Sequence, residues 1–295
     1  MPGGVKQMNV LVTGAAGNVG SKVAEYLADQ GMQVRATDTR MHPRPKMRLV
    51  IANLLDPLAC YNLMDGIEAV VHLANHPHAH AAPFVNLYHE NLTMTHNIFQ
   101  TAIEYRLKKI VYISSIQAFT GRRLWTENPG PSGLPYLPLD SDMPQNPGNV
   151  YALSKCASED MLRYVAKHSQ TQCVALRLPW VASEKRHRSS QKNPEWPRHH
   201  INLDECLCYL LRPDVAALVH CILKTDLPGY RIYFPAAPET SYGKPAGEML
   251  DEYYRNVPLR IPREQCTSLV DISRITADTG WKPQYSLHTE SPVTP

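Results

Sequence analysis

The chain has 295 residues, of which 43% are hydrophobic and 19% charged, as is typical of a globular protein with one large domain or one domain and a smaller lobe. The formal net charge of +3 is spread along the sequence, which excludes a nucleic-acid-binding function, and the single basic run at 184–192 is expected to be a solvated loop. No segment has the apolar length of a membrane span or a signal peptide, and the seven cysteines include no Cys-x-x-Cys pair, so we expect a cytoplasmic protein with reduced thiols.

Apolar runs rich in β-branched residues alternate with amphipathic stretches through most of the chain. Strands are predicted at 8–13, 32–38, 49–54, 69–75, 109–115, 172–178 and 230–234. Helices are predicted at 19–30, 57–65, 84–106, in the segment that carries Tyr151, and near 213–223. This alternation predicts a parallel sheet covered by helices on both faces.

Two stretches depart from the alternation. Residues 121–149 are rich in proline and are expected to form an ordered but irregular loop. The tail at 235–295 contains prolines and short helical segments. A tail of this kind usually builds a smaller lobe over the carboxyl edge of the sheet, where ligands bind.

The turn between the first strand and the first helix, VLVTGAAGNVG (10–20), contains three glycines that suit a dinucleotide. Gly14 permits the tight turn, Gly17 lets the backbone approach a pyrophosphate, and Gly20 allows close helix–strand packing. The helix N-terminus that follows presents N–H groups to the phosphates. The alternative is a glycine turn that holds no ligand.

An acidic residue at the end of the second strand extends this pattern. Asp38 follows the glycines by about 20 residues, where a carboxylate accepts hydrogen bonds from the adenosine ribose. It would repel the additional phosphate of NADP, so NAD is the favoured cofactor. Arg35 and Arg40 flank Asp38 and keep NADP as the alternative.

The stretch VYALSK (150–155) places Tyr151 and Lys155 four residues apart at the start of a predicted helix. Side chains at this spacing share a helix face, with their Cβ atoms about 5–6 Å apart. An ammonium so close lowers the pKa of a phenol from about 10, which would let Tyr151 act as a general base. The alternative is a tyrosine and a lysine on a solvated face.

The histidines of HPHAH (76–80) alternate and could share one face of an extended segment. A proline interrupts them, and no carboxylate or cysteine nearby completes a metal site. We therefore expect a loop that borders a pocket, and no metal.

In their order and spacing these segments resemble the extended short-chain dehydrogenases/reductases, the NAD-dependent epimerase/dehydratase group of sugar-modifying enzymes. The first half is similar to the family in its phosphate loop TGAAGNVG (13–20), in its adenine segment NLLD (53–56) with Asn53 for the usual aspartate, in HLAN (72–75), and in NLTMTHNIF (91–99) with Met94 for glycine. The second half is similar in KIVYISSIQAF (109–119), in the Tyr-x-x-x-Lys motif YALSK (151–155), in LRLPWV (176–181), in RPDVAALVHCIL (212–223) and in DTGWKPQYSL (278–287).

The resemblance implies an α/β fold, a Rossmann-type doubly wound parallel sheet with a small C-terminal substrate lobe. Residues 1–180, with 205–234 returning to them, would form the NAD-binding domain. Residues 181–204 and 235–295 would form the substrate-binding lobe. The substrate would be a small, carbohydrate-like molecule, and a homodimer is expected only by analogy with the family.

The resemblance also assigns the site residues. The catalytic residues are Ser115, Tyr151 and Lys155. The cofactor contacts are Gly14, Ala16, Gly17, Asn18, Val19, Asp38, Asn53, Leu54, Leu73, Ala74, Asn75, Asn91, Ile113, Tyr151, Lys155 and Leu178. The substrate contacts are His76, Ser115, Gln117, Pro179 and Trp180. In the family's chemistry the tyrosine takes the proton of a substrate hydroxyl, the lysine lowers the phenol's pKa and holds the nicotinamide ribose, and the serine orients the substrate oxygen.

Departures from the family pattern narrow the function. Where the family's nucleotide-sugar dehydratases carry Asp-Glu, this chain has Ile116 and Gln117, neither of which titrates, so a 4,6-dehydratase is not expected. The short tail offers few arginines for a nucleotide diphosphate, and the basic loop at 183–200 suits an acidic or polyhydroxylated substrate. The pattern is closest to the uronate-dehydrogenase-like branch.

The first hypothesis is therefore an NAD-dependent oxidoreductase that transfers hydride at a secondary alcohol of a sugar or sugar acid. The alternatives are a nucleotide-sugar epimerase with tightly bound NAD, and a module that binds NAD(H) without turnover.

Overall fold

Seven parallel strands form the central sheet of the computed structural model, which describes residues 7–41, 48–121, 133–183 and 203–288. In spatial order the strands are β3 (Leu49–Ile51), β2 (Gln33–Asp38), β1 (Asn9–Thr13), β4 (Ala69–His72), β5 (Lys109–Ser115), β6 (Gln172–Leu178) and β9 (Tyr230–Tyr233). The chain is an α/β protein with a doubly wound parallel sheet, as the sequence predicts.

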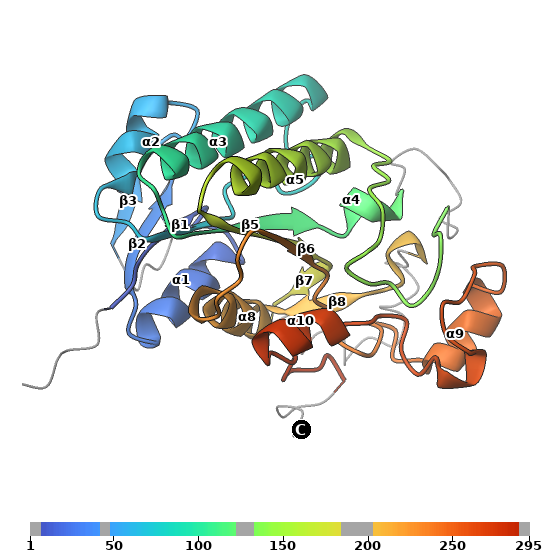
Figure 1. Cartoon of the computed structure of the whole chain (residues 1–295). Coiled ribbons are helices and arrows are strands. Elements are labelled where there is room, and N and C mark those ends of the chain that lie inside the picture. Colours follow the sequence, from blue (N-terminus) through green and yellow to red (C-terminus); the bar gives the residue numbers. More distant parts are fainter. Residues whose placement is uncertain (1–6, 42–47, 122–132, 184–202, 289–295) are drawn as a thin grey trace, which may run out of the picture.

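Helices cover both faces of this sheet (Figure 1). One face carries α2 (Pro57–Met64), α3 (Phe84–Glu104) and α5 (Val150–His168), and the other carries α1 (Gly20–Asp29), α8 (Arg212–Lys224) and α10 (Ser273–Thr279). Neighbouring residues of β1 serve opposite layers, since Val10 and Val12 belong to the cluster of α1 and α8 while Leu11 belongs to that of α2 and α3. Burial on both faces explains why the strands are continuous apolar runs.

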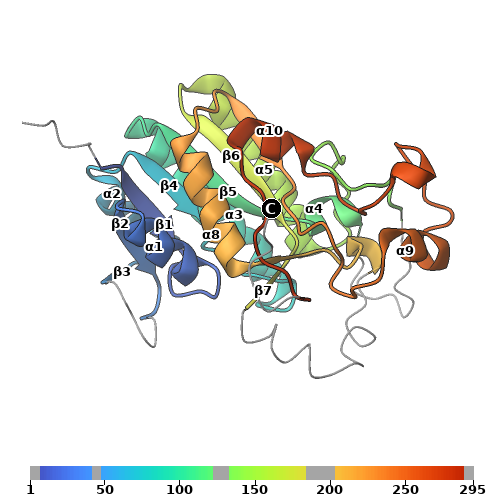
Figure 2. The ribbon, with the colours of Figure 1, turned by 90° about the horizontal axis from the view of Figure 1, so that it is seen from below.

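A smaller group of elements extends from one end of the sheet (Figure 2). It contains α9 (Ala246–Tyr253) and the short 3-10 turns η1 (Leu203–Glu205) and η2 (Arg263–Gln265). Its apolar side chains, among them Leu203, Met249 and Tyr254, pack with Phe119 of α4 (Gln117–Thr120). The segment directly after β5 is therefore anchored in this second core.

Some predicted elements differ in extent, and some short ones were not predicted. β4 ends at His72 instead of residue 75, because the backbone N–H groups of Leu73 and Ala74 turn to donate to the Thr13 hydroxyl, each at 3.1 Å. The helix α4 and the two-stranded sheet of β7 (Trp180–Ala182) and β8 (Tyr209–Leu211) are additional. Most of the basic loop predicted at 183–200 lies outside the described residues, as does most of the predicted lobe segment 181–204.

In the part of the chain that the structure describes, no helix is both long enough and apolar enough to cross a membrane.

Candidate active site

The three glycines of the β1–α1 turn have different surroundings. A Cβ at Gly14 would lie 2.8 Å from the Ala74 backbone nitrogen, and one at Gly20 would lie 2.2 Å from the Gly14 carbonyl oxygen. Gly14 also has a φ of +68°, which favours glycine. A Cβ at Gly17 would meet only the Gly14 carbonyl oxygen, at 3.1 Å. Gly14 and Gly20 thus serve the packing of the turn, while the outer side of Gly17 is open to a ligand.

The helix that follows the turn fits an anionic ligand. Val19 precedes α1, and its apolar side chain forms no capping hydrogen bond with the N-terminal N–H groups of this ten-residue helix. Asn18 lies at the turn's outer edge, where its amide oxygen accepts a hydrogen bond from Arg212 at 3.1 Å. Uncapped N–H groups and the positive end of the helix dipole suit phosphate oxygens.

Asp38, at the end of β2, faces the same turn. Its carboxylate accepts a hydrogen bond from the Ala16 backbone nitrogen at 3.0 Å and another from the Thr39 nitrogen at 2.8 Å. Arg35 was one of the two arginines that left NADP as an alternative cofactor. Its guanidinium donates to the carbonyl oxygens of Leu63 and Asp65 at the end of α2, both at 2.8 Å. Arg35 therefore does not face the position that a 2′-phosphate beside Asp38 would take.

A buried amide without a partner lies just beyond β4. Neither the oxygen nor the nitrogen of the Asn75 side chain is exposed, and neither has a hydrogen-bond partner among the described residues. Buried polar groups are normally paired, so this amide is suited to a polar ligand. Together with the open side of Gly17 and the uncapped helix, it makes the residues at this edge fit a dinucleotide.

Several other residues predicted to contact the cofactor form hydrogen bonds or packing contacts within the protein instead. The Asn91 amide accepts from the His76 nitrogen at 2.8 Å and donates to Ser154 at 3.1 Å, so it ties the loop after β4 to α5. The Asn53 side chain accepts from the Leu55 nitrogen at 3.1 Å. Leu54 is buried among α2 and α3.

The predicted proton-transfer residues meet at the carboxyl end of β5. Ser115 is the last residue of the strand, and its hydroxyl lies close enough to the Tyr151 phenol to act against the rise of the phenol's pKa. The Asn149 side chain accepts a hydrogen bond from the Ala152 nitrogen at 2.9 Å, which starts α5 and puts Tyr151 in its first turn. The Lys155 ammonium lies 5.5 Å from the centroid of the tyrosine ring and donates to the Ile113 carbonyl oxygen at 2.7 Å.

Burial controls the pKa values of this pair. It raises the pKa of Tyr151 to about 12, against the opposing effect of the Ser115 hydroxyl, and the charge of Glu205 adds to the rise. It lowers the pKa of Lys155 to about 7, and Glu159 opposes that change. The sequence predicts a phenol pKa lowered by the lysine, and the structure gives the opposite direction, because both groups are enclosed and the ammonium donates to a backbone carbonyl.

The predicted substrate contacts surround Ser115. The Gln117 backbone nitrogen donates to the Ser115 hydroxyl at 3.2 Å, and its side chain accepts from Asn149 at 3.2 Å. Leu178 pairs with Ser115 across β5 and β6, so Pro179 and Trp180 follow at the same edge.

The histidine segment lies next to the tyrosine. Ala79, between His78 and His80, packs with Leu87 and Tyr151. The His76 imidazole contacts the Glu90 carboxylate of α3 at 2.6 Å. No group of three or more potential metal ligands occurs among the residues that the structure describes. Sequence reasoning missed Glu90, Glu159 and Glu205, since single acidic residues on helices carry no motif.

Comparison with known proteins agrees with this geometry. Residues 10–204 match the model of the NAD dependent epimerase/dehydratase family. The chain is 29% identical over 183 residues to an NAD-dependent glucose-6-phosphate dehydrogenase of Haloferax volcanii, a match that covers 57% of this chain and 67% of that protein. It is 25% identical over 172 residues to a uronate dehydrogenase of Pseudomonas putida, with 57% and 59% covered.

Epimerases are similar to the chain as well. A UDP-glucose 4-epimerase of Bacillus subtilis is 27% identical over 186 residues, which are 57% of this chain and 51% of that protein. The solved structure of a UDP-glucose 4-epimerase of Thermotoga maritima superposes with a TM-score of 0.70 at 18% identity and covers 95% of both chains. At this identity, the structural similarity shows that the two proteins share a fold.

Proposed function

Because the chain belongs to the NAD-dependent epimerase/dehydratase family, and so to the NAD-dependent enzymes of the short-chain dehydrogenase type, we propose that it oxidises a secondary alcohol of a sugar or sugar acid. One observation carries the proposal. The Ser115 hydroxyl lies beside the Tyr151 phenol at the end of β5 and acts to lower the phenol's pKa, with Lys155 one helical turn away. That constellation lies at the carboxyl edge of a sheet whose β1–α1 turn fits a dinucleotide.

The cofactor in this proposal is NAD, which when bound supplies the hydride acceptor for the alcohol carbon. The turn around Gly17 and the start of α1 would hold its phosphates, and Asp38 would accept from its ribose. Asn75 would give its unpaired amide to the cofactor. Arg35 points away from this position, which favours NAD over NADP.

The chain's own residues would move one proton. Ser115 would donate to or accept from the substrate oxygen and hold it beside Tyr151. The Tyr151 phenolate would take the hydroxyl proton as the alcohol becomes a carbonyl. Lys155 would stabilise the phenolate from the same helix face.

The substrate class rests on what surrounds these groups. Ile116 and Gln117 cannot supply a second acid or base, which argues against elimination of water. His76 with Glu90, and Trp180 at the start of β7, would contact the hydroxyl groups or the acidic group of a sugar. In this proposal, residues 1–180 with 205–234 bind NAD, and residues 181–204 and 235–295 form the substrate lobe of a cytoplasmic enzyme.

A panel of sugars and sugar acids, incubated with NAD and separately with NADP, tests the function. We expect reduced cofactor to accumulate with NAD, as followed by its absorbance, and not with the Tyr151→Phe variant. Product formation without net reduced cofactor would make the protein an epimerase, as the epimerase relatives suggest. Cofactor binding without turnover of any member of the panel would favour the module that only binds NAD(H).

A further inference from the structure

A buried ion pair lies one helical turn beyond Lys155. The Arg177 guanidinium of β6 donates twice to the Glu159 carboxylate of α5, from Nε to Oε1 at 2.9 Å and from Nη2 to Oε2 at 2.8 Å. The exposed fractions of the two side chains are 3% and 0%. The proton transfer proposed above makes no use of this pair.

The ion pair is joined to the strand that carries Ser115. Strand register places Ser114 opposite Arg177, and the Ser114 hydroxyl donates to Glu159 Oε1 at 2.6 Å. On the preceding residue of β5, the Ile113 carbonyl accepts from Lys155 at 2.7 Å. Two side chains of α5 one turn apart are thus fastened to the two residues directly before Ser115.

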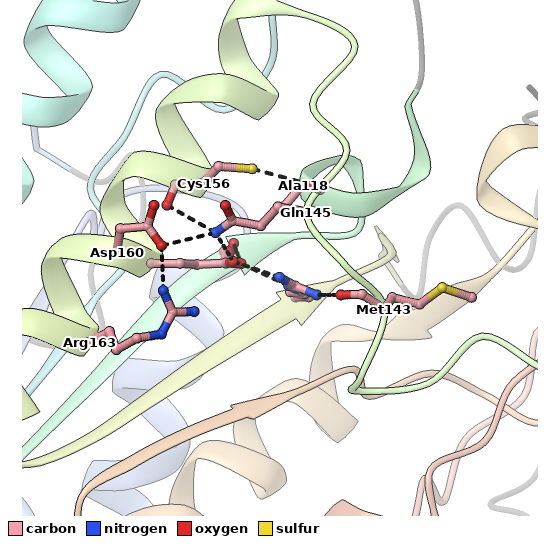
Figure 3. Close-up of polar contacts among 9 residues, drawn as sticks. Ala118, Met143, Gln145, Cys156, Asp160 and Arg163 are labelled. Atoms are coloured by element: carbon pink, nitrogen blue, oxygen red, sulfur yellow. Dashed lines mark hydrogen bonds and ion pairs between the residues drawn. The ribbon is translucent and has the colours of Figure 1, made fainter. Parts of the chain in front are cut away.

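The same pair fastens the segments on either side of the site (Figure 3). Gln145, in the loop before α5, donates to Glu159 Oε2 at 3.1 Å and to the Cys156 carbonyl oxygen at 3.3 Å. Arg177 also donates to the Met143 carbonyl oxygen at 2.6 Å. The Cys156 thiol donates to the Ala118 carbonyl oxygen of α4 at 3.3 Å. Figure 3 shows these contacts converging between α5 and the carboxyl ends of the strands.

We propose that Glu159 is a positioning residue. Held in place by its ion pair with Arg177, it fixes the positions of Lys155 and Ser115 relative to each other and supplies the negative charge beside the lysine. It acts through these residues and does not touch the substrate. The inference rests on the proposed function for its effect on turnover, but not for its effect on Lys155.

The groups that face Lys155 make Glu159 decisive for its charge. Tyr151 of α5 and Tyr112 of β5 present their rings, at 5.5 and 5.0 Å from the ammonium. Burial keeps the pKa values of both phenols above their ordinary range and lowers the pKa of His72 of β4 to about 3, so all three are neutral near pH 7. Glu159 is the anion that raises the lysine pKa against burial.

A merely structural role can be separated from this one by an apolar replacement. Buried ion pairs replaced by apolar residues of similar volume often keep a protein's stability, whereas removal of one partner leaves a buried charge. The variant is therefore Glu159→Met with Arg177→Met. The control is Arg163→Met, which removes an exposed charge from the same helix and leaves Asp160, a contact of Gln145, in place.

Two measurements are made on the full chain. The first is the titration of Lys155, followed by NMR of ¹³Cε-labelled lysine and assigned with Lys155→Met. The second is kcat on a substrate from the panel. In the buried-pair variant we expect the titration midpoint to fall by about one pH unit, as is usual on loss of a nearby opposite charge. We expect kcat to fall about 10²-fold, the scale of small misplacements. The control should change neither.

An unchanged midpoint or an unchanged kcat in the folded buried-pair variant overturns the proposal. If that variant does not fold, Glu159→Asp decides instead. Its carboxylate keeps the charge but is one methylene shorter, so the midpoint should stay while kcat falls, and a wild-type kcat overturns the proposal. If the wild type turns over no substrate, the proposed function fails, and the Lys155 midpoint alone then decides the inference.

Discussion

The Tyr151–Lys155 pair can hold the same number of protons in two arrangements. One is a neutral phenol with a neutral amine, and the other is a phenolate with an ammonium. Burial favours the uncharged arrangement, since it raises the pKa of the phenol to about 12 and lowers that of the lysine to about 7. Such a pair loses its protons in steps that belong to both residues. In the proposed mechanism the step that matters is therefore the first loss of a proton from the pair, which depends on the charges placed around it.

Replacement of Tyr151 by Phe removes one hydroxyl from this pair and leaves the packing of the ring with Ala79 and Leu87. A positioned acid–base group contributes roughly 10²–10⁴-fold, and we expect that loss in kcat. The dissociation constant for NAD, measured by titration calorimetry, should not change. In the wild type, kcat should rise with pH through the first proton loss of the pair, and this limb should vanish in the variant. Near-normal activity of Tyr151→Phe would mean that another base acts, with the histidines at 76–80 examined first.

Asp38 holds the glycine turn and is proposed to hold the ribose. Asp38→Ala should weaken NAD binding by about 1.5–3 kcal/mol, the scale of a hydrogen bond to a charged group, and should reduce the preference for NAD over NADP. Dissociation constants for both cofactors measure the effect. Arg35→Met is the matched control, because the Arg35 guanidinium donates to carbonyl oxygens of α2 and its neighbouring turn. Tighter binding of NADP than of NAD by the wild type would contradict this assignment.

The resemblance of short motifs to the family was enough to propose Ser115, Tyr151 and Lys155 as the catalytic residues. The surroundings of these residues could not be predicted in the same way. Glu159 of α5 meets Arg177 of β6 only because this helix packs on this strand, and a sequence pattern does not give that packing. The raised pKa of the phenol follows from enclosure by segments far apart in the chain.

The glycines of the β1–α1 turn have different roles. A side chain at Gly20 would collide with the Gly14 carbonyl, whereas one at Gly17 approaches the same oxygen at 3.1 Å and otherwise faces outward. Gly17→Ala should therefore keep most of the thermal stability and lose NAD affinity. Gly20→Ala should lower the melting temperature strongly. Thermal unfolding and NAD titration of the two variants test this. Normal NAD affinity in a folded Gly17→Ala protein would mean that the phosphates bind elsewhere.

At the scale of elements, most of the long strands and helices could be predicted within a few residues. Strands buried on both faces are continuous apolar runs, and the helices between them show one apolar face. The elements missed are α4, β7 and β8, each of three or four residues. Elements that short repeat neither hydrophobic pattern often enough to be recognised, and tertiary contacts set their conformation.

For the whole molecule, the arrangement of layers decides where polar groups can be buried. The neighbouring strands β1, β4, β5 and β6 end at one edge, so their last residues and the loops that follow form the candidate site. The core directly beneath contains His72, whose ring nitrogens pair with Thr13 at 2.9 Å and Thr95 at 3.3 Å. This arrangement links the glycine turn to α3 through a neutral imidazole.

That imidazole should make the stability of the whole protein sensitive to acid. Burial lowers the pKa of His72 to about 3, whereas an unfolded histidine titrates near its ordinary value of 6.5. Between pH 6.5 and 3 the unfolded chain therefore binds a proton that the folded chain does not, so the free energy of unfolding should fall as the pH falls through this window. Asp214 acts in the opposite direction, because burial raises its pKa to about 6 and the folded state gains stability from its protonation.

The contribution of His72 is therefore measured as a difference in the free energy of unfolding between the wild type and His72→Gln. Urea unfolding at a series of pH values from 7 to 4 gives this difference. We expect the variant to be less stable at pH 7 through lost packing but to lose less stability as the pH falls. Equal slopes in the two proteins would show that His72 takes up its proton in the folded state.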